Sequence, residues 1–293
     1  MKLYTINTSY FKLDGGAMFG VVPKSIWQKL QPADDNNMCT WALRCLLIEA
    51  EGKLILIDNG MGTKQDAKFF SHYYLHGNDS LESSLAAHGF TTDDITDVVL
   101  THLHFDHCGG SIKKEGNVMV PAFKNATYWS NHNHWKWATT PNDREKASFL
   151  KENILPIKES GQLKMIEFSA AANIINTDKK CVPVASGIIS QLSFIIANGH
   201  TDAMMLPVIN YNGTTLVFMA DLLPSTAHLP LPYVMGYDMF PLTTLHEKKE
   251  FLNMAYTNNY VLFFEHDPLH ECCTLLQTEK GITVNKVFKL SEM

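Results

Sequence analysis

Short apolar runs bounded by turn residues recur along the chain and predict a fold rich in β-strands. Residues 41–48 and 54–57 are two such runs, and the Glu51-Gly52 pair between them predicts a hairpin turn. A short buried strand is expected at 97–100. The first hundred residues are therefore predicted to form a β-meander that leads into mixed α and β structure. Later runs of the same kind predict strands at 191–197, 211–220, 260–264 and 282–290, with a turn at 212–213.

Helical periodicity is limited to a few segments. Asp79 is a candidate N-cap for a helix through His88, which Gly89 would end. Leu81 and Leu85 would share the buried face of that helix.

Two further helices are expected. Residues 143–151 have a helical pattern, and Thr244 with Glu247 forms a capping-box pattern for a helix that reaches about Thr257. Because strands and helices alternate in both halves of the sequence, the fold class is predicted to be α/β, a sandwich around two sheets.

The segment at about 123–159 differs from its surroundings, and we interpret it as a helical insertion into a single domain that spans 1–293. Its tryptophans either cover a hydrophobic substrate pocket or belong to the core of a surface helix pair. The same segment, or the region of Phe19, is a candidate contact for a homodimer. Its aromatic and imidazole side chains are Trp129, His132, His134, Trp135 and Trp137.

Composition narrows the class of protein. Hydrophobic residues make up 45% and charged residues 18% of the 293 positions, which is ordinary for a globular protein. The formal net charge is −6, and the scattered Lys and Arg side chains form no basic stripe for nucleic acid. No apolar run approaches the ~18 residues of a membrane span. The six cysteines form no Cys-x-x-Cys pair, so we expect reduced thiols and a cytoplasmic protein.

Four side chains of the metal-binding type lie within six residues, directly after the strand predicted at 97–100: His102, His104, Asp106 and His107. In an extended chain His102 and His104 point to the same side, and a turn beyond them can aim the other two at a neighbouring point. This spacing suits two metal centres. Imidazole with carboxylate favours Zn²⁺, with Mn²⁺, Co²⁺ and Fe²⁺ as alternatives.

Three more residues of this type end predicted strands: His200, Asp221 and His266. Each alone has an ordinary structural explanation, since an Asp after a strand often caps the next helix. Together with the histidine-rich motif they indicate that loops from several strands meet at one edge of a sandwich.

These motifs resemble the metallo-β-lactamase superfamily. The resemblance rests on His-x-His-x-Asp-His at 102–107, Gly-His-Thr at 199–201, Ala-Asp at 220–221, Glu-His-Asp at 265–267 and Ile-Asp-Asn-Gly at 57–60. It implies an αββα sandwich and two zinc ions per chain. It assigns His102, His104 and His200 to one zinc ion, Asp106, His107 and His266 to the other, and Asp221 to both. Asp58 would support the ligands from behind.

Hydrolysis is the expected reaction. A water shared by two zinc ions ionises near neutral pH and can attack a carbonyl or phosphorus centre, and Asp106 or Asp221 can pass the proton to the leaving group. Within the superfamily, His104 argues against flavin-diiron proteins and Asp221 against true β-lactamases. The short stretch after His266 argues against glyoxalase II.

The branches that remain are N-acyl homoserine lactonases and organophosphate hydrolases of the methyl-parathion type, both of which share a segment similar to residues 14–24. We favour the lactonase, a quorum-quenching enzyme, because the motif at 102–110 resembles that group. A non-catalytic protein that sequesters an acyl ligand is the alternative outside enzymes. Many such lactonases have a tyrosine soon after the bridging Asp, whereas Leu222 follows Asp221 here. The candidate substitutes are Tyr233, Tyr237, His132, His134 and His228.

Overall fold

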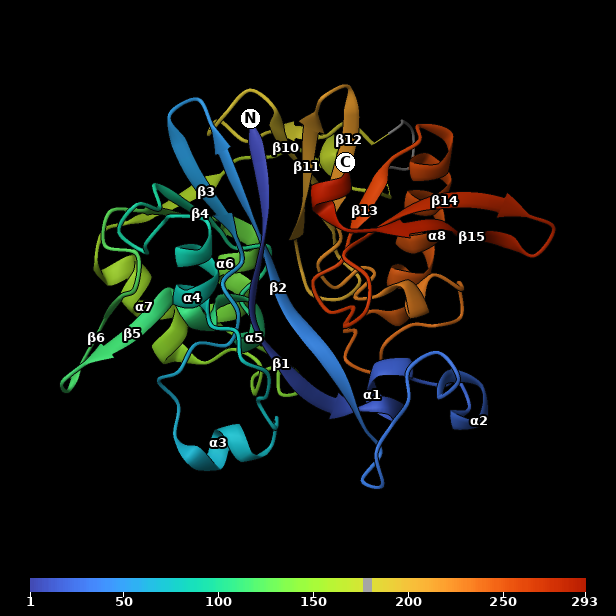
Figure 1. The fold of residues 1–293 in the computed structure, drawn as a ribbon, viewed down its shortest axis with the longest axis horizontal. Helices are drawn as coiled ribbons and strands as arrows, with labels where there is room; N and C mark the ends of the chain where they lie inside the picture. The colour runs from blue at the N-terminus through green and yellow to red at the C-terminus, as the bar shows by residue number, and fades with distance from the viewer. Residues whose placement is uncertain (176–180) are drawn as a thin grey trace. The chain divides into compact units, whose positions relative to one another are not determined.

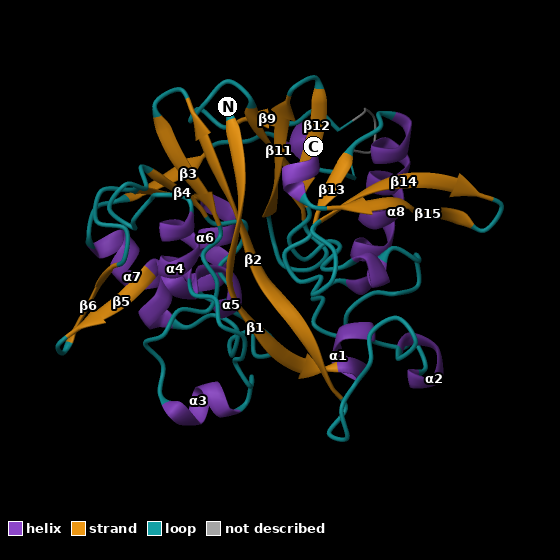
Figure 2. Ribbon diagram, in the orientation of Figure 1, coloured by secondary structure: helices purple, strands orange, loops and turns teal. Residues whose placement is uncertain are grey.

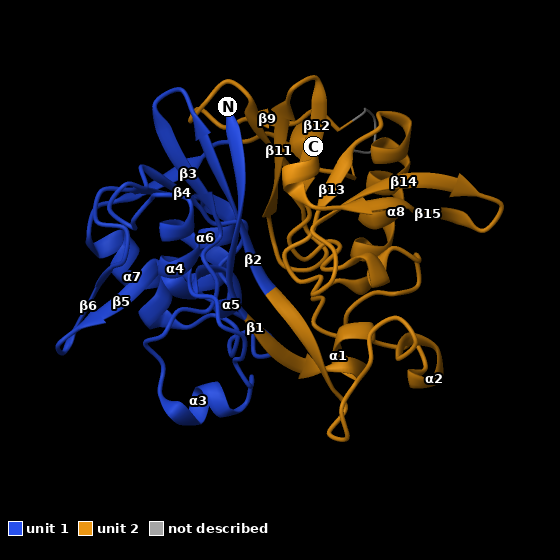
Figure 3. Cartoon of the chain, in the orientation of Figure 1, with its two compact units in different colours: residues 1–9, 43–167 blue, residues 10–42, 168–293 orange. Residues whose placement is uncertain are grey.

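Two sheets organise the protein, and each belongs mainly to one of two compact units (Figure 3). The computed structural model describes residues 1–175 and 181–293. Unit 1 comprises Met1–Ser9 and Leu43–Glu167, and unit 2 comprises Tyr10–Ala42 and Phe168–Met293.

The sheet of unit 1 has six strands in the order β1-β2-β3-β4-β7-β8 (Figure 1). Strands β2 and β3 form an antiparallel hairpin, and β3, β4, β7 and β8 are parallel. The bounds are β1 Lys2–Asp14, β2 Met38–Ala50, β3 Lys53–Ile57, β4 Asp97–Val99, β7 Thr127–Asn131 and β8 Leu163–Ile166. The first residues of β2 and the last of β1 belong to unit 2.

Helices connect the parallel strands of unit 1, as parallel pairing requires. They are α3 Ala67–Ser71, α4 Leu81–Ala87, α5 Phe105–Cys108, the 3₁₀ turn η1 Gly109–Ser111, α6 His132–Thr139 and α7 Lys151–Glu159. A small hairpin, β5 Ile112–Glu115 with β6 Val118–Pro121, lies beside them. The core forms where α4, α6 and α7 cover one face of the sheet, with Leu85, Trp135 and Ile157 packed among Leu47 and Val98.

The sheet of unit 2 has seven strands in the order β15-β14-β13-β12-β11-β10-β9 (Figure 2). Neighbours are antiparallel except β12 and β13, which the long helix α8 Pro241–Thr257 connects. That helix packs against β14 and β15 (Figure 1). The bounds are β9 Val184–Ala185, β10 Leu192–Ala197, β11 Met204–Tyr211, β12 Thr214–Phe218, β13 Val261–Phe263, β14 Cys272–Thr278 and β15 Gly281–Phe288. Short helical turns complete the unit: α1 Gly15–Phe19, α2 Lys24–Trp27, η2 Ala170–Ala172, η3 Thr226–His228 and η4 Leu290–Glu292.

The predicted strands are confirmed, with bounds that differ by a few residues. The two predicted hairpin turns also form: Glu51 and Gly52 have φ angles of 52° and 73°, and Asn212 and Gly213 have 49° and 80°. Positive φ at both positions is the type I′ geometry that matches the twist of a hairpin.

Three predictions about helices were wrong in detail. Ser80, not Asp79, caps α4, because its hydroxyl accepts from the backbone of Ser83. Residues 143–148 form turns instead of a helix, and α7 begins only at Lys151. The side chain of Asn142 accepts from the amides of Arg144 and Glu145, which favours a turn over a helix.

Helix α8 begins at Pro241 and not at Thr244, so the expected capping box does not form. Proline suits the first position of a helix because that position needs no N–H donor. Thr244 therefore lies about one turn and Glu247 nearly two turns inside the helix. The carboxylate of Glu247 binds the backbone amides of Asn198 and Gly199, elsewhere in unit 2.

None of the helices in the described part of the chain is long and apolar enough to cross a membrane. All six cysteines are free thiols, as predicted. Cys181 is partly exposed, and the other five are completely buried: Cys39, Cys45, Cys108, Cys272 and Cys273.

Candidate metal centre

The histidine-rich motif follows β4 in unit 1. Beyond the strand the chain runs without regular structure to His104, which is the N-cap of the single turn α5. His102, His104, Asp106 and His107 are all buried. Buried polar groups need partners, and the motif supplies them largely from within unit 1.

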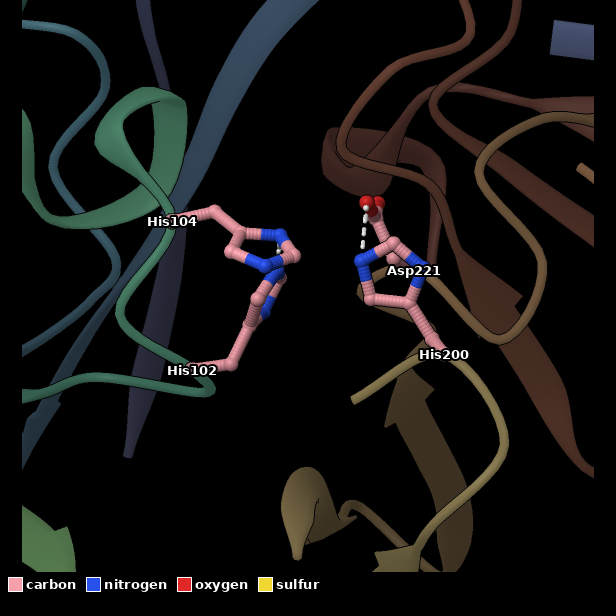
Figure 4. A group of neighbouring side chains, drawn as sticks. All are labelled: His102, His104, His200 and Asp221. Carbon is pink, nitrogen blue, oxygen red and sulfur yellow. Dashed lines mark hydrogen bonds and ion pairs between the residues drawn. The ribbon is translucent and has the colours of Figure 1, made fainter. Parts of the chain in front are cut away.

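His102 and His104 face each other, as the alternation of an extended chain predicts. Nε2 of His102 lies 3.1 Å from Nδ1 of His104, and the rings meet edge to face at 79° (Figure 4). The turn of α5 places Asp106 beside His107, with 3.9 Å between Oδ2 and Nε2.

In each of these rings we call the nitrogen that points at the other proposed ligands the inner nitrogen and the opposite one the outer nitrogen. Two carboxylates contact outer nitrogens of this group. Oε1 of Glu145 lies 2.9 Å from Nε2 of His104, and Oδ2 of Asp58 lies 3.1 Å from Nδ1 of His107. A carboxylate accepts, so each outer nitrogen carries the ring proton and the inner nitrogen presents its lone pair.

Asp58 also fixes the start of the motif. Its carboxylate accepts from the amide of Thr101 at 2.8 Å and from the Thr101 hydroxyl at 2.6 Å. Because that hydroxyl has only one hydrogen, it accepts from Nδ1 of His102, 3.1 Å away. Asp58 adopts a φ of 55°, a conformation that costs a non-glycine residue free energy and tends to occur at functional sites. It lies behind the motif, as expected.

Unit 2 brings together the other three predicted ligands. The carboxylate of Asp221 joins two imidazoles, with Oδ2 at 3.1 Å from Nε2 of His200 and Oδ1 at 3.2 Å from Nε2 of His266. Figure 4 shows the contact between Asp221 and His200. Ala220, directly before the aspartate, has a φ of 41° and turns the chain after β12.

The outer nitrogens in unit 2 also face acceptors. Nδ1 of His200 lies 2.8 Å from Oδ1 of Asp238, and Nδ1 of His266 lies 2.8 Å from the carbonyl oxygen of Ala42. His200 and His266 therefore present lone pairs to the carboxylate of Asp221.

The loop that carries His200 is held by α8. Glu247 accepts from the backbone amides of Asn198 at 2.6 Å and Gly199 at 2.9 Å. Burial raises the pKa of Glu247 to about 7. The neighbouring Lys248 is also buried, and its Nζ donates to the carbonyls of Pro230 at 2.7 Å and Tyr233 at 2.9 Å.

These contacts test whether the residues fit a metal. In each unit, inner nitrogens with lone pairs face either one another or a carboxylate, an arrangement that repels unless a cation lies between the groups. Buried imidazole and carboxylate donors with their outer atoms hydrogen-bonded are the usual environment of zinc and similar metals. The donor set fits.

The other sequence candidates differ in their surroundings. His132 is exposed and pairs with Glu167, whereas Nε2 of His134 accepts from the amide of Leu103. Both nitrogens of His228 have partners, the Ser225 hydroxyl and the Met18 carbonyl. Tyr233 lies edge-on to Phe19, and Tyr237 is exposed.

The tryptophans of the 123–159 segment have packing or hydrogen-bond partners within unit 1. Trp135 belongs to the buried core of unit 1, and Trp137 packs against that core. The indole N–H of Trp129 donates to Asp97 at 2.8 Å. For Trp135 the core interpretation is therefore confirmed.

Three residues that contact the outer nitrogens of proposed ligands were not predicted from the sequence: Glu145, Asp238 and Thr101. Thr101 adjoins the motif, so its position was a usable signal. Glu145 and Asp238 lie far along the chain from the histidines they hold and look like ordinary surface residues in the sequence.

This chain resembles known proteins both in sequence and in three-dimensional structure. An N-acyl homoserine lactonase of Bacillus thuringiensis is 29% identical over 117 residues, which is 36% of this chain and 45% of that protein. The chain thus matches less than half the length of its curated relatives.

Solved structures match nearly the whole chain. A probable metal-dependent hydrolase from Staphylococcus aureus has a TM-score of 0.83 at 26% identity, covering 98% of this chain and 96% of that one. AidC, a dizinc quorum-quenching lactonase in complex with a product, has a TM-score of 0.75 at 21% identity, covering 98% and 95%. The predicted fold class, mixed α/β with sheets flanked by helices, is confirmed. Residues 44–266 match the Metallo-beta-lactamase superfamily, and the chain belongs to this superfamily of metal-dependent hydrolases.

Proposed function

We propose that this protein opens the lactone ring of N-acyl homoserine lactones. The observation that carries the proposal is the orientation of five buried histidines. In each of them the outer nitrogen is hydrogen-bonded and the inner nitrogen points at another proposed metal ligand. The similarity to N-acyl homoserine lactonases supports this substrate class over other esters.

We propose two Zn²⁺ ions per chain, with Mn²⁺, Co²⁺ and Fe²⁺ as alternatives. His102, His104 and His200 would hold one ion, Asp106, His107 and His266 the other, and Asp221 both. The two oxygens of Asp221 already face separate imidazoles, which suits a carboxylate shared between two ions. We also propose that residues 1–293 work as one domain. The superfamily match, which includes residues of both units, supports this.

When bound, such ions activate water and polarise an ester carbonyl. The chain's own residues then manage the proton. We assign the transfer to the leaving oxygen to Asp106, because 13% of its side chain is exposed against 9% for Asp221. Asp58, Glu145 and Asp238 keep protons on the outer histidine nitrogens, so the inner nitrogens stay available.

Mass spectrometry of N-decanoyl homoserine lactone, incubated with the zinc-loaded protein, tests the proposal. We expect a product heavier by one water that returns to the lactone on acidification. Loss of this activity in Asp106→Asn with the zinc content intact would support Asp106 as the group that passes the proton, since an amide cannot carry it.

Other results would point elsewhere. Unchanged lactone with two zinc ions per chain would reject the lactonase, and turnover of a phosphotriester under the same conditions would identify the organophosphate hydrolase instead. Slow release of intact lactone would indicate a protein that sequesters its ligand.

Two further expectations remain part of the proposal. The free thiols fit a cytoplasmic location. A homodimer would use the region after Phe19, where Val21, Ile26 and Leu30 are exposed. Analytical ultracentrifugation of the wild type and of Val21→Asp would test the dimer.

A further inference from the structure

The aromatic helix α6 faces the histidine-rich motif in unit 1. His134 and Trp137 lie one helical turn apart, and both contribute to the surroundings of that motif. The proposed function uses neither residue.

His134 holds the backbone between two proposed ligands. Its Nε2 accepts from the amide of Leu103 at 2.8 Å. Asn131, the N-cap of α6, accepts from the amide of His134 and fixes the start of the helix. Leu103 separates His102 from His104, so this single hydrogen bond orients both sides of the motif.

Trp137 acts on the same motif through a carboxylate. Its indole Nε1 donates to Oε2 of Glu145 at 2.6 Å, while Oε1 of Glu145 faces Nε2 of His104 at 2.9 Å. Oε2 also accepts from Nδ2 of Asn142, at the longer distance of 3.4 Å. An indole N–H has a fixed direction, so the shorter contact with Trp137 restricts the orientation of the carboxylate.

Glu145 and His104 are buried, and burial makes the geometry of their hydrogen bonds important. The side chain of Glu145 is 1% exposed, and the ring of Phe149 packs against His104 with 4.8 Å between centroids. In such surroundings a carboxylate is costly unless both oxygens are satisfied. The turns at 143–148 that replace the expected helix place Glu145 here.

We propose that Glu145 is a positioning residue for His104, and that Trp137 is the residue that orients Glu145. This inference rests on the proposed metal site. A carboxylate on the outer nitrogen fixes the ring tautomer and raises the basicity of the inner nitrogen, and loss of such a partner typically lowers metal affinity about 10- to 100-fold.

The chain offers a matched control. Trp129 also donates its indole N–H to a buried carboxylate, Asp97, at 2.8 Å, but Asp97 bonds to Lys53 and Thr96 and not to a proposed ligand. Trp137→Phe and Trp129→Phe therefore remove the same kind of hydrogen bond within the same unit. Only the first should affect a metal.

The test is zinc affinity, measured by competition with a chromophoric chelator, together with the visible spectrum of the Co²⁺-loaded protein. Glu145→Gln should weaken zinc binding at the site that includes His104 by about 10- to 100-fold. Trp137→Phe should weaken it less and change the Co²⁺ spectrum, while Trp129→Phe should match the wild type in both. Thermal unfolding of the zinc-free proteins checks that all three variants fold.

Two results would overturn the inference: wild-type zinc affinity in both Glu145→Gln and Trp137→Phe, or an equal loss in Trp129→Phe. A wild type that binds no zinc would overturn both this inference and the proposed function. A wild type that binds zinc tightly but leaves lactones intact would remove the proposed substrate and leave the role of Glu145 standing.

Discussion

Gly199 packs so closely against Thr244 that a Cβ atom at residue 199 would lie 2.3 Å from the Thr244 backbone nitrogen. Thr244 lies in α8, one turn before Glu247, whose carboxylate binds the amide of Gly199. The loop that carries His200 is therefore fixed to α8 by both a steric fit and a hydrogen bond.

Gly199→Ala should disrupt this fit. The added methyl group would meet the backbone nitrogen and Cα of Thr244 at 2.3 and 2.5 Å as well as its hydroxyl oxygen at 2.3 Å. The two backbone atoms cannot rotate away, so we expect the free energy of unfolding to fall by about 2–4 kcal/mol. Bound zinc should fall as His200 moves. Urea denaturation and metal analysis measure the two effects. Gly16→Ala is the control, because its Cβ would meet side-chain ends and no backbone atom, Oδ1 of Asp14 at 2.9 Å and Nδ2 of Asn37 at 3.7 Å. Equal effects in both variants would contradict the explanation.

Glu247→Gln should loosen the same loop without a steric change. The carboxylate accepts from two backbone amides, whereas a glutamine has one acceptor oxygen and leaves one amide facing its NH₂ group. We expect a loss of about 1–3 kcal/mol in the free energy of unfolding, the usual cost of an unsatisfied buried donor. Hydrogen exchange at Asn198 and Gly199 should accelerate more than elsewhere in unit 2. Uniform acceleration would argue against a local role.

His228 should make the protein sensitive to acid. Burial lowers the pKa of His228 from 6.5 to about 3, with Lys248 lowering it further and Asp221 and Asp267 opposing. At a pH between about 3 and 6.5, His228 binds a proton in the unfolded chain but not in the folded chain. The free energy of unfolding should therefore fall as the pH falls from about 6.5, by up to about 1.4 kcal/mol per pH unit.

His228→Gln isolates this contribution. Its amide can still donate to the Met18 carbonyl, as Nε2 of His228 does at 3.0 Å, but it does not titrate. We expect a shallower pH dependence in urea denaturation between pH 6.5 and 4, alongside a constant loss from the stacking on Phe19, 4.6 Å between centroids. A slope equal to that of the wild type would exclude His228 as the source.

Removal of metal should destabilise the protein. Without a cation, the lone pairs of His200 and His266 face the carboxylate of Asp221. A chelator should lower the melting temperature and added zinc should restore it. Free zinc at about 1,000 times its Kd would contribute about 4 kcal/mol to the free energy of unfolding. A melting temperature that does not respond to zinc would contradict the proposed metal site.

The sequence was informative where the signal is local. Period-two alternation placed His102 and His104 on one side, and the turn pairs at 51–52 and 212–213 formed the predicted hairpins. These features depend on neighbouring residues. The strand ends that carry His200 and Asp221 were visible for the same reason, because an apolar run directly precedes each.

Long-range contacts were not visible in the same way. Glu145 and Asp238 look like ordinary surface residues in the sequence, yet the fold brings them to His104 and His200. Glu247 matched a local capping pattern with Thr244, yet the buried amides of the His200 loop are its partners. A carboxylate satisfied by distant donors leaves no periodic trace in the sequence.

The difference in exposure among the six thiols allows local opening of the protein to be measured by their chemical reactivity. Cys181 is partly exposed and the other five cysteines are completely buried. Burial raises the pKa of Cys108 and of Cys273 to about 12, which keeps both in the unreactive thiol form. Burial also raises the pKa of Cys181, to about 11, so exposure sets the order of reaction. An alkylating reagent should modify Cys181 first, and the rate at which the remaining five react records how often each unit opens.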